Sequence, residues 1–171
     1  MEERTLIRRA IGGDKEAFAA VYMQYRNALY RYAYFRLGDQ TDAEDAVSAC
    51  VVAAFEGISG LRSEAAFRAW IFRILYRSCG NLLAARSAEI HNVGEEALEA
   101  VPDEGGERLT PELTEAFGVL DDEDREIVLL SVIAGYNSRE IASLMSLKPT
   151  TVRSRLSRSL AKMRLFLTTA D

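Results

Sequence analysis

The sequence predicts an all-α fold of two small helical domains, the second a helix-turn-helix, joined by a flexible acidic linker. Three observations support this prediction. Apolar residues recur at intervals of three and four along most of the chain, which is the period of an amphipathic helix. Alternating runs bounded by turn residues, the pattern of a strand, are nearly absent. An acidic stretch at residues 89–108, with Pro102 and the pair Gly105-Gly106, interrupts the helical pattern.

Length and composition agree with two small soluble domains. The chain has 171 residues, of which 49% are hydrophobic and 27% charged, and these fractions exclude wholesale disorder. Cys50 and Cys79 are too few for a secreted disulfide scaffold, so we expect free buried thiols in a reducing cytoplasm. The N-terminus lacks a signal peptide, and no apolar stretch approaches the about 20 residues of a membrane helix. We therefore expect a cytoplasmic protein without a membrane segment.

Capping residues and apolar periodicity define the helices of the first domain, residues 1–88. Side chains with a short polar oxygen favour the position before a helix, and glycine favours the position after it. We expect three long helices here. Their expected starts and ends are Asp14 to about Leu37, Thr41 or Asp42 to the breakers Gly57 and Gly60, and Ser63 to about Arg86.

The second domain, residues 109–171, is expected to contain four helices. Proline is favoured at the first helical position, which helps to place two of the starts. The second of the four is expected to end near Gly135. The expected starts are Thr110-Pro111-Glu112, Asp121 or Asp122, Ser138, and Lys148-Pro149.

The overall net charge of −5 hides a basic segment. Residues 89–108 and 109–136 each carry −6, whereas residues 1–88 carry +2 and residues 137–171 carry +5. From Lys148 to Arg164 there are six basic residues and no acid. An exposed face that serves only solubility usually carries both positive and negative charges. The all-basic charge of this segment therefore favours a nucleic-acid partner over a solvated helical hairpin.

The same segment has the spacing of a helix-turn-helix. A short helix over residues 139–145 meets a tight turn at 146–148, and Pro149 opens a longer helix. Hydroxyl and backbone N–H groups at a helix start bind phosphates, and arginine can read guanine edges in the major groove. Base contact and phosphate contact stay open for any single side chain. The residues expected to be buried between the two helices are Ile141, Ala142, Leu144, Leu147, Val152 and Leu156.

Two features of the first domain allow two interpretations each. Phe72 and Tyr76 lie among Arg73 and Arg77, away from the main apolar stripe of their helix. The two aromatic rings could stack on unpaired bases, or they could be buried in a core packed on two sides. An acidic cluster at a helix start could complement the helix dipole or dock a protein. The members of that cluster are Asp39, Asp42, Glu44 and Asp45.

No catalytic constellation is present in the sequence. The one histidine, His91, lies in the expected linker. Paired-cysteine metal spacing, a glycine-rich phosphate loop and a nucleophile elbow are all lacking. We therefore expect no enzyme activity, no metal site and no cofactor.

Several motifs in order resemble the extracytoplasmic-function sigma factors of the major bacterial sigma family. The match covers nearly the whole chain apart from the linker. The motifs are Gly13-Asp14-Lys15-Glu16-Ala17-Phe18, Asp42-Ala43-Glu44-Asp45-Ala46-Val47, Phe67-Arg68-Ala69-Trp70-Ile71-Phe72-Arg73-Ile74, Arg125-Glu126-Ile127-Val128-Leu129-Leu130, Arg139-Glu140-Ile141-Ala142 and Thr151-Val152-Arg153-Ser154-Arg155-Leu156-Ser157-Arg158.

This resemblance implies a protein that binds core RNA polymerase and directs it to promoters, under control of an anti-sigma factor. The first domain would dock on polymerase and read and melt the minus-ten element, and the second would read the minus-thirty-five element. The residues implied for docking are Asp42, Glu44, Asp45 and Ser48. Those implied for the minus-ten element are Arg62, Ser63, Phe72, Arg73, Tyr76 and Arg77. Those implied for the minus-thirty-five element are Lys148, Thr150, Thr151, Arg153, Ser154, Arg155 and Arg158.

Two departures from the family pattern leave alternatives open. Ser48-Ala49 stands where the family usually has Gln-Glu, which allows a helix-turn-helix regulator without polymerase docking. The segment Ser78 to Ser87 contains Gly80 and a single basic residue, Arg86, which allows a module that only titrates an anti-sigma factor.

Overall fold

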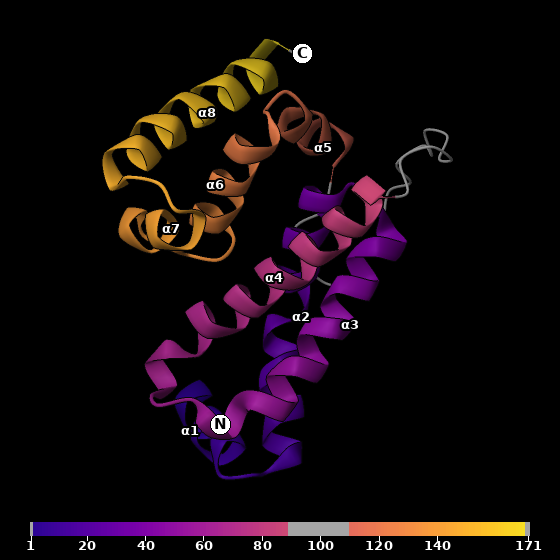
Figure 1. Ribbon diagram of the computed structural model, residues 1–171, viewed down its shortest axis with the longest axis vertical. Coiled ribbons are helices and arrows are strands. Elements are labelled where there is room, and N and C mark those ends of the chain that lie inside the picture. The colour runs from indigo at the N-terminus through magenta and orange to yellow at the C-terminus, as the bar shows by residue number, and fades with distance from the viewer. Residues whose placement is uncertain (1, 89–109, 170–171) are drawn as a thin grey trace. The chain divides into compact units, whose positions relative to one another are not determined.

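The computed structural model describes residues 2–88 and 110–169, and every regular element within these ranges is a helix (Figure 1). The all-α prediction is therefore confirmed. The chain divides into two compact units with a boundary between Glu96 and Ala97. That boundary, the expected linker and His91 lie outside the described residues, so the linker and the domain limits stay predictions. None of the described helices is long and apolar enough to span a bilayer.

The N-terminal unit, residues 2–88, opens with α1 (Glu3–Ile11) and α2 (Lys15–Leu37). As predicted, Asp14 caps α2, and its Oδ1 accepts a hydrogen bond from the backbone N–H of Ala17 at 3.1 Å. Gly38 ends the helix with a φ of 73°, a left-handed conformation that glycine adopts without a steric penalty. The first long helix therefore has the limits that local chemistry predicts.

The next helix, α3 (Gln40–Gly57), begins earlier than predicted. Asp39 is its cap, because the Asp39 Oδ1 accepts a hydrogen bond from the N–H of Asp42 at 2.8 Å. The prediction of a cap at Thr41 or Asp42 is wrong. Gly38 has already turned the chain, and Asp39 is the first side chain after it that can accept a helical N–H.

Two short 3-10 turns, η1 (Ile58–Gly60) and η2 (Glu64–Ala66), connect α3 to α4 (Phe67–Ala88). Ser63 does act as a cap, with its Oγ 3.2 Å from the backbone nitrogen of Ala65. It caps the 3-10 turn η2, which then runs directly into α4.

Aromatic side chains fill the core among α2, α3 and α4. Tyr32, Phe67 and Phe72 are among the largest fully buried side chains. The rings of Tyr32 and Phe72 meet edge to face with centroids 5.9 Å apart, and those of Tyr25 and Phe67 do so at 5.2 Å. Edge-to-face pairs of this kind add to the free energy gained from burial alone.

Both cysteines are buried free thiols, as predicted. The Sγ of Cys50 on α3 lies 3.6 Å from the carbonyl oxygen of Ile71 on α4. Burial, with a smaller contribution from Cys79, raises the pKa of Cys50 to about 12. The thiol is therefore protonated and unreactive in the folded protein.

Four helices form the C-terminal unit, residues 110–169. Thr110, Asp121 and Asn137 each cap one of them through a side-chain oxygen, and Asn137 does so within a reciprocal capping box. The second helix ends at Val132, short of the expected end near Gly135. The four helices are α5 (Pro111–Gly118), α6 (Asp122–Val132), α7 (Ser138–Met145) and α8 (Pro149–Thr169).

The last two helices, α7 and α8, form the predicted helix-turn-helix (Figure 1). Ser146 ends α7 in the left-handed region, with a φ of 57°, and its N–H donates to the carbonyl oxygen of Ala142. Of the six residues expected between the helices, Ile141, Ala142 and Val152 are buried, and the other three, Leu144, Leu147 and Leu156, are half-buried.

Candidate functional site

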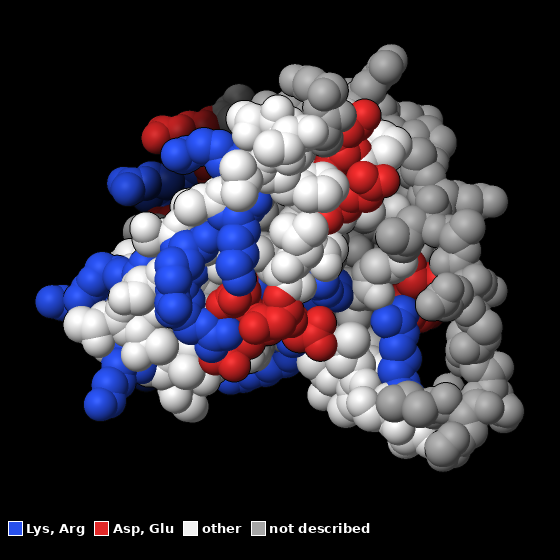
Figure 2. Space-filling view, turned by 90° about the horizontal axis from the view of Figure 1, so that it is seen from above, with Lys and Arg blue, Asp and Glu red and all other residues white. Residues whose placement is uncertain are grey.

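The first turns of α8 carry most of the side chains expected to contact duplex DNA. Thr151 among them is half-buried. Figure 2 shows Lys and Arg side chains spread over the face it presents, with groups of Asp and Glu side chains among them. The N-terminus of a helix attracts phosphate because its free N–H groups can donate hydrogen bonds and the positive end of the helix dipole lies there. The exposed members of the set are Lys148, Thr150, Arg153, Ser154 and Arg158.

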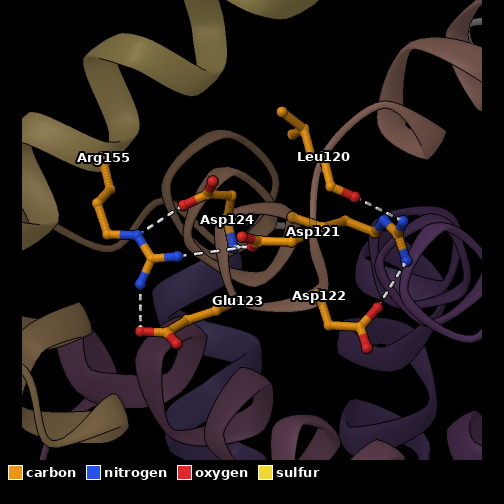
Figure 3. Close-up of polar contacts among 7 residues, drawn as sticks. Leu120, Asp121, Asp122, Glu123, Asp124 and Arg155 are labelled. Carbon is orange, nitrogen blue, oxygen red and sulfur yellow. Dashed lines mark hydrogen bonds and ion pairs between the residues drawn. The ribbon is translucent and has the colours of Figure 1, made fainter.

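Arg155 differs from its neighbours because its guanidinium is held by carboxylates of the same unit (Figure 3). Its Nε lies 2.7 Å from Oδ1 of Asp124, one terminal nitrogen lies 2.5 Å from Oε1 of Glu123, and the other lies 3.5 Å from Oδ1 of Asp121. The side chain keeps only 20% of its surface exposed. Every nitrogen of this guanidinium thus faces a carboxylate of the α6 start.

The electrostatic balance around Arg155 favours the charged pair. Burial by itself lowers the pKa of Arg155. The hydrogen bond that Arg155 donates to Asp124, together with the charges of Asp124, Glu123 and Asp121, outweighs this effect and raises that pKa above its ordinary value. The same carboxylates lie at the positive N-terminal end of α6, which stabilises their charged form.

Arg125 links the start of α6 to the end of α5. Its Nε and one terminal nitrogen donate to the carbonyl oxygens of Phe117 and Leu120 at 3.1 and 3.0 Å. Its other terminal nitrogen lies 3.3 Å from Oδ1 of Asp122. Sequence reasoning missed both arginine networks, although four consecutive acids at residues 121–124 were a signal that arginine partners exist nearby.

In the N-terminal unit, Phe72 does not lie on a surface. It is fully buried against Tyr32, and the guanidinium carbon of Arg68 lies 5.4 Å from its ring centroid. Of the two interpretations of Phe72, the structure agrees with burial in a core packed on two sides. Helix α4 packs against both α2 and α3, so an aromatic residue away from the main apolar stripe still enters the core.

The other residues predicted for the minus-ten element lie nearer to solvent. Tyr76 is half-buried, with the guanidinium carbon of Arg36 4.8 Å from its ring centroid. Arg36 also donates to the backbone carbonyl of Tyr76 at 2.9 Å. Arg73 and Arg77 are exposed and, at a spacing of four, share one face of α4. Arg62 and Ser63 are exposed as well, in the connection before η2.

Residues predicted to dock on polymerase lie in the first three turns of α3. Glu44, Asp45 and Ser48 are exposed. Asp42 forms an ion pair with Arg86, which lies near the C-terminal end of α4. Arg86 also donates a hydrogen bond to the carbonyl oxygen of Leu37 at 2.9 Å. The acidic face therefore presents exposed carboxylates, of which that of Glu44 accepts a hydrogen bond from Nε2 of Gln40 at 3.2 Å. Asp42 takes part in the internal structure as well.

Taken together, the described side chains are arranged for binding. The C-terminal unit offers a basic helix start, and the N-terminal unit offers an arginine face on α4 and an acidic face on α3. Such surfaces suit phosphate groups and a basic protein partner, respectively.

Two protein-family models match the chain, one in each unit. Sigma-70 region 2 matches residues 21–89, and Sigma-70, region 4 matches residues 111–163. Among curated proteins, the RNA polymerase sigma factor CnrH of Cupriavidus metallidurans is 27% identical, over 96% of this chain and 94% of that protein. The ECF RNA polymerase sigma-E factor of Haemophilus influenzae is also 27% identical, over 93% of this chain and 92% of that protein.

Two solved structures are similar in fold. CnrH in complex with the cytosolic domain of CnrY matches with a TM-score of 0.67 at 23% identity, covering 99% of both chains. The sigma factor RpoE of Bartonella quintana, in complex with the anti-sigma factor NepR, matches with a TM-score of 0.75 at 21% identity. That match covers 88% of this chain and 96% of RpoE.

Proposed function

This chain belongs to the sigma-70 family, in its extracytoplasmic-function branch, and from that premise we propose that it binds core RNA polymerase and directs it to a specific set of promoters. Sigma factors initiate transcription by binding and are not enzymes. The observation that carries the proposal is the order of the two family regions along one chain, the second being a helix-turn-helix with a basic, acid-free recognition helix start.

The proposed reader of the minus-thirty-five element is the start of α8. Exposed cationic and hydroxyl side chains there support phosphate contact, and the arginines support contact with guanine edges. The residues proposed for this role are Lys148, Thr150, Thr151, Arg153, Ser154 and Arg158. Arg155, which sequence reasoning places in the same set, has its guanidinium held by carboxylates.

For the minus-ten element we propose the exposed face of α4 together with the connection before it. Arg73 and Arg77 would contact the backbone of the separated strands, and the half-buried ring of Tyr76 would meet a base. Arg62 and Ser63 complete the proposed set. Phe72 is excluded by its burial.

For polymerase docking we propose the exposed acidic face of α3, formed by Glu44, Asp45 and Ser48 with Asp42 at its edge. Carboxylates on a helix surface suit a basic partner surface and speed its encounter with the chain. We further infer that an anti-sigma factor controls the chain, supported by the complex of its fold relative RpoE with NepR. Because its partners would be polymerase and promoter DNA, we place the protein in the bacterial cytoplasm.

The first test is a titration of the labelled chain with purified bacterial core RNA polymerase in the absence of DNA. We expect a saturable one-to-one complex that another sigma factor displaces. Absence of binding by the folded chain would overturn the proposal. It would favour a DNA-binding regulator without polymerase docking, or a module that titrates an anti-sigma factor.

A pair of charge variants refines this test. Asp45→Lys reverses an exposed charge on the proposed docking face, and we expect it to weaken core binding by about tenfold, the order of one lost charge pair. Glu115→Lys makes the same charge change on the exposed surface of α5 and should leave core binding unchanged. Equal effects of both variants would show that only net charge matters.

A further inference from the structure

The contacts of Arg155 connect the recognition helix α8 to the start of α6. Its three guanidinium nitrogens face three different carboxylates, those of Asp124, Glu123 and Asp121 (Figure 3). Asp124, at 15% exposure, is the most buried of the three, and its Oδ1 accepts a hydrogen bond from Nε at 2.7 Å. A planar guanidinium that is bound at several nitrogens has a fixed orientation, which a single flexible ion pair does not provide.

The acidic side of this contact is itself fixed. Asp121 caps α6 by accepting from the N–H of Asp124 at 2.8 Å, so two of the carboxylates belong to one capped turn. Arg125 ties the same turn to the end of α5 through the carbonyl oxygens of Phe117 and Leu120. Arg155 thus connects α8 to the start of α6, and Arg125 connects that start to the end of α5.

The same geometry argues against direct contact between Arg155 and DNA. A phosphate that approached this guanidinium would also meet the exposed carboxylates of Asp121 and Glu123, 64% and 46% of whose surface is open. Moving Arg155 to DNA would leave three carboxylates without their cation. Arg153 and Arg158 flank it on α8, are exposed, and have no carboxylate partner among the described residues.

We propose that Arg155 is a positioning residue for promoter recognition: it sets the orientation of α8 through the carboxylates of α6 and does not contact DNA. This inference rests on the proposed function and deepens it. It differs from the interpretation of Arg155 as a base-reading residue, and the two interpretations predict opposite effects for one substitution.

That substitution is Asp124→Asn, which keeps the shape of the side chain and removes its charge. If Arg155 acts by positioning, the variant loosens α8 and weakens binding of the full-length chain to a 30-base-pair random-sequence duplex by about threefold to tenfold. If Arg155 contacts DNA, the variant frees it and strengthens binding. Glu123→Gln, which removes a second partner, should act in the same direction as Asp124→Asn.

Asp122→Asn is the matched control. It removes the same negative charge from the same helical turn, but Asp122 pairs with Arg125 and not with Arg155 among the described contacts. Less negative charge near DNA favours binding, so this control should bind the duplex as tightly as the wild type or more tightly. Fluorescence anisotropy at a temperature well below each variant's melting point separates these effects from unfolding.

Salt dependence provides the second readout. Each phosphate contact contributes about 0.9 to the slope of log affinity against log salt. Arg155→Ala should weaken binding with the slope unchanged, whereas Arg158→Ala should lower the slope by about 0.9. A loss of slope in Arg155→Ala, or binding by Asp124→Asn that is tighter than that of the control Asp122→Asn, would overturn the inference while wild-type binding still supports the proposed function. If the wild type binds neither the duplex nor core polymerase, both are overturned.

Discussion

Tyr32 on α2 and Phe72 on α4 meet edge to face at 5.9 Å, and each ring is fully buried. The guanidinium carbon of Arg68 lies 5.4 Å from the centroid of the Phe72 ring. The pair joins the helix proposed to melt promoter DNA to the longest helix of the N-terminal unit. Phe72 therefore supports, from within the core, the helix whose exposed face we propose for promoter melting.

Replacing Phe72 by alanine should strongly destabilise the N-terminal unit. The substitution removes a fully buried ring and leaves a cavity, which costs about 3–5 kcal/mol in the free energy of unfolding. Denaturant unfolding followed by circular dichroism measures this cost. Met23→Ala, at a side chain that is 59% exposed on α2, serves as the control and should change the free energy by about 0.5 kcal/mol or less. Similar costs for both variants would contradict the buried position of Phe72.

Gly80→Ala should stabilise the protein. Gly80 lies inside α4, and a Cβ added there would have no atom within 4 Å. Alanine in a helix interior is favoured over glycine by about 1 kcal/mol. Gly38→Ala is the opposite case, because Gly38 has a φ of 73° and alanine is strained in that region. Thermal melts should shift upward for the first variant and downward for the second.

Ser159→Ala should also stabilise the protein. Ser159 on α8 is 1% exposed, and its Oγ has no hydrogen-bond partner among the described residues. Removing a buried hydroxyl without a partner recovers about 1 kcal/mol of desolvation cost. Ser157→Ala, two residues away and exposed, should be nearly neutral. A loss of stability in Ser159→Ala would indicate that a water or a partner binds the hydroxyl.

Asp14 should contribute to acid sensitivity. The N–H of Ala17, and then Arg9, hold the pKa of Asp14 below its ordinary value of 3.8. A carboxylate with a depressed pKa in the folded state stabilises the fold above its ordinary pKa, and that contribution is lost as pH falls through the folded value. Asp14→Asn keeps a capping side chain but cannot titrate.

Unfolding curves at pH values on either side of 3.8 check this prediction. The wild type should lose more stability on acidification than Asp14→Asn, because all other carboxylates are common to both proteins. Parallel losses in the two proteins would show that the Asp14 carboxylate is not preferentially stabilised in the fold.

Local chemistry was enough to predict most helix limits but not which polar or aromatic side chains face inward. Asp14, Thr110 and Asp121 cap the helices that follow them because a side-chain oxygen beside free N–H groups is a short-range signal. The start of α3 was missed because Asp39, Thr41 and Asp42 are all able to cap, and the left-handed turn at Gly38 decides among them.

Phe72 and Arg155 are two residues whose surroundings could not be predicted from sequence periodicity. A helical wheel shows which residues share a face, but the number of faces that are covered depends on tertiary neighbours. Helix α4 is covered on two sides, which buries Phe72. Arg155 meets carboxylates that precede it by about thirty positions, so only the folded arrangement of α6 and α8 reveals their contact.

Arg86 joins three helix ends of the N-terminal unit. One guanidinium near the end of α4 joins the last carbonyl of α2, at Leu37, to the first turn of α3, at Asp42. The C-terminal end of α4 is therefore fastened to two other helices by a single side chain. Loss of that one side chain would remove both contacts at once.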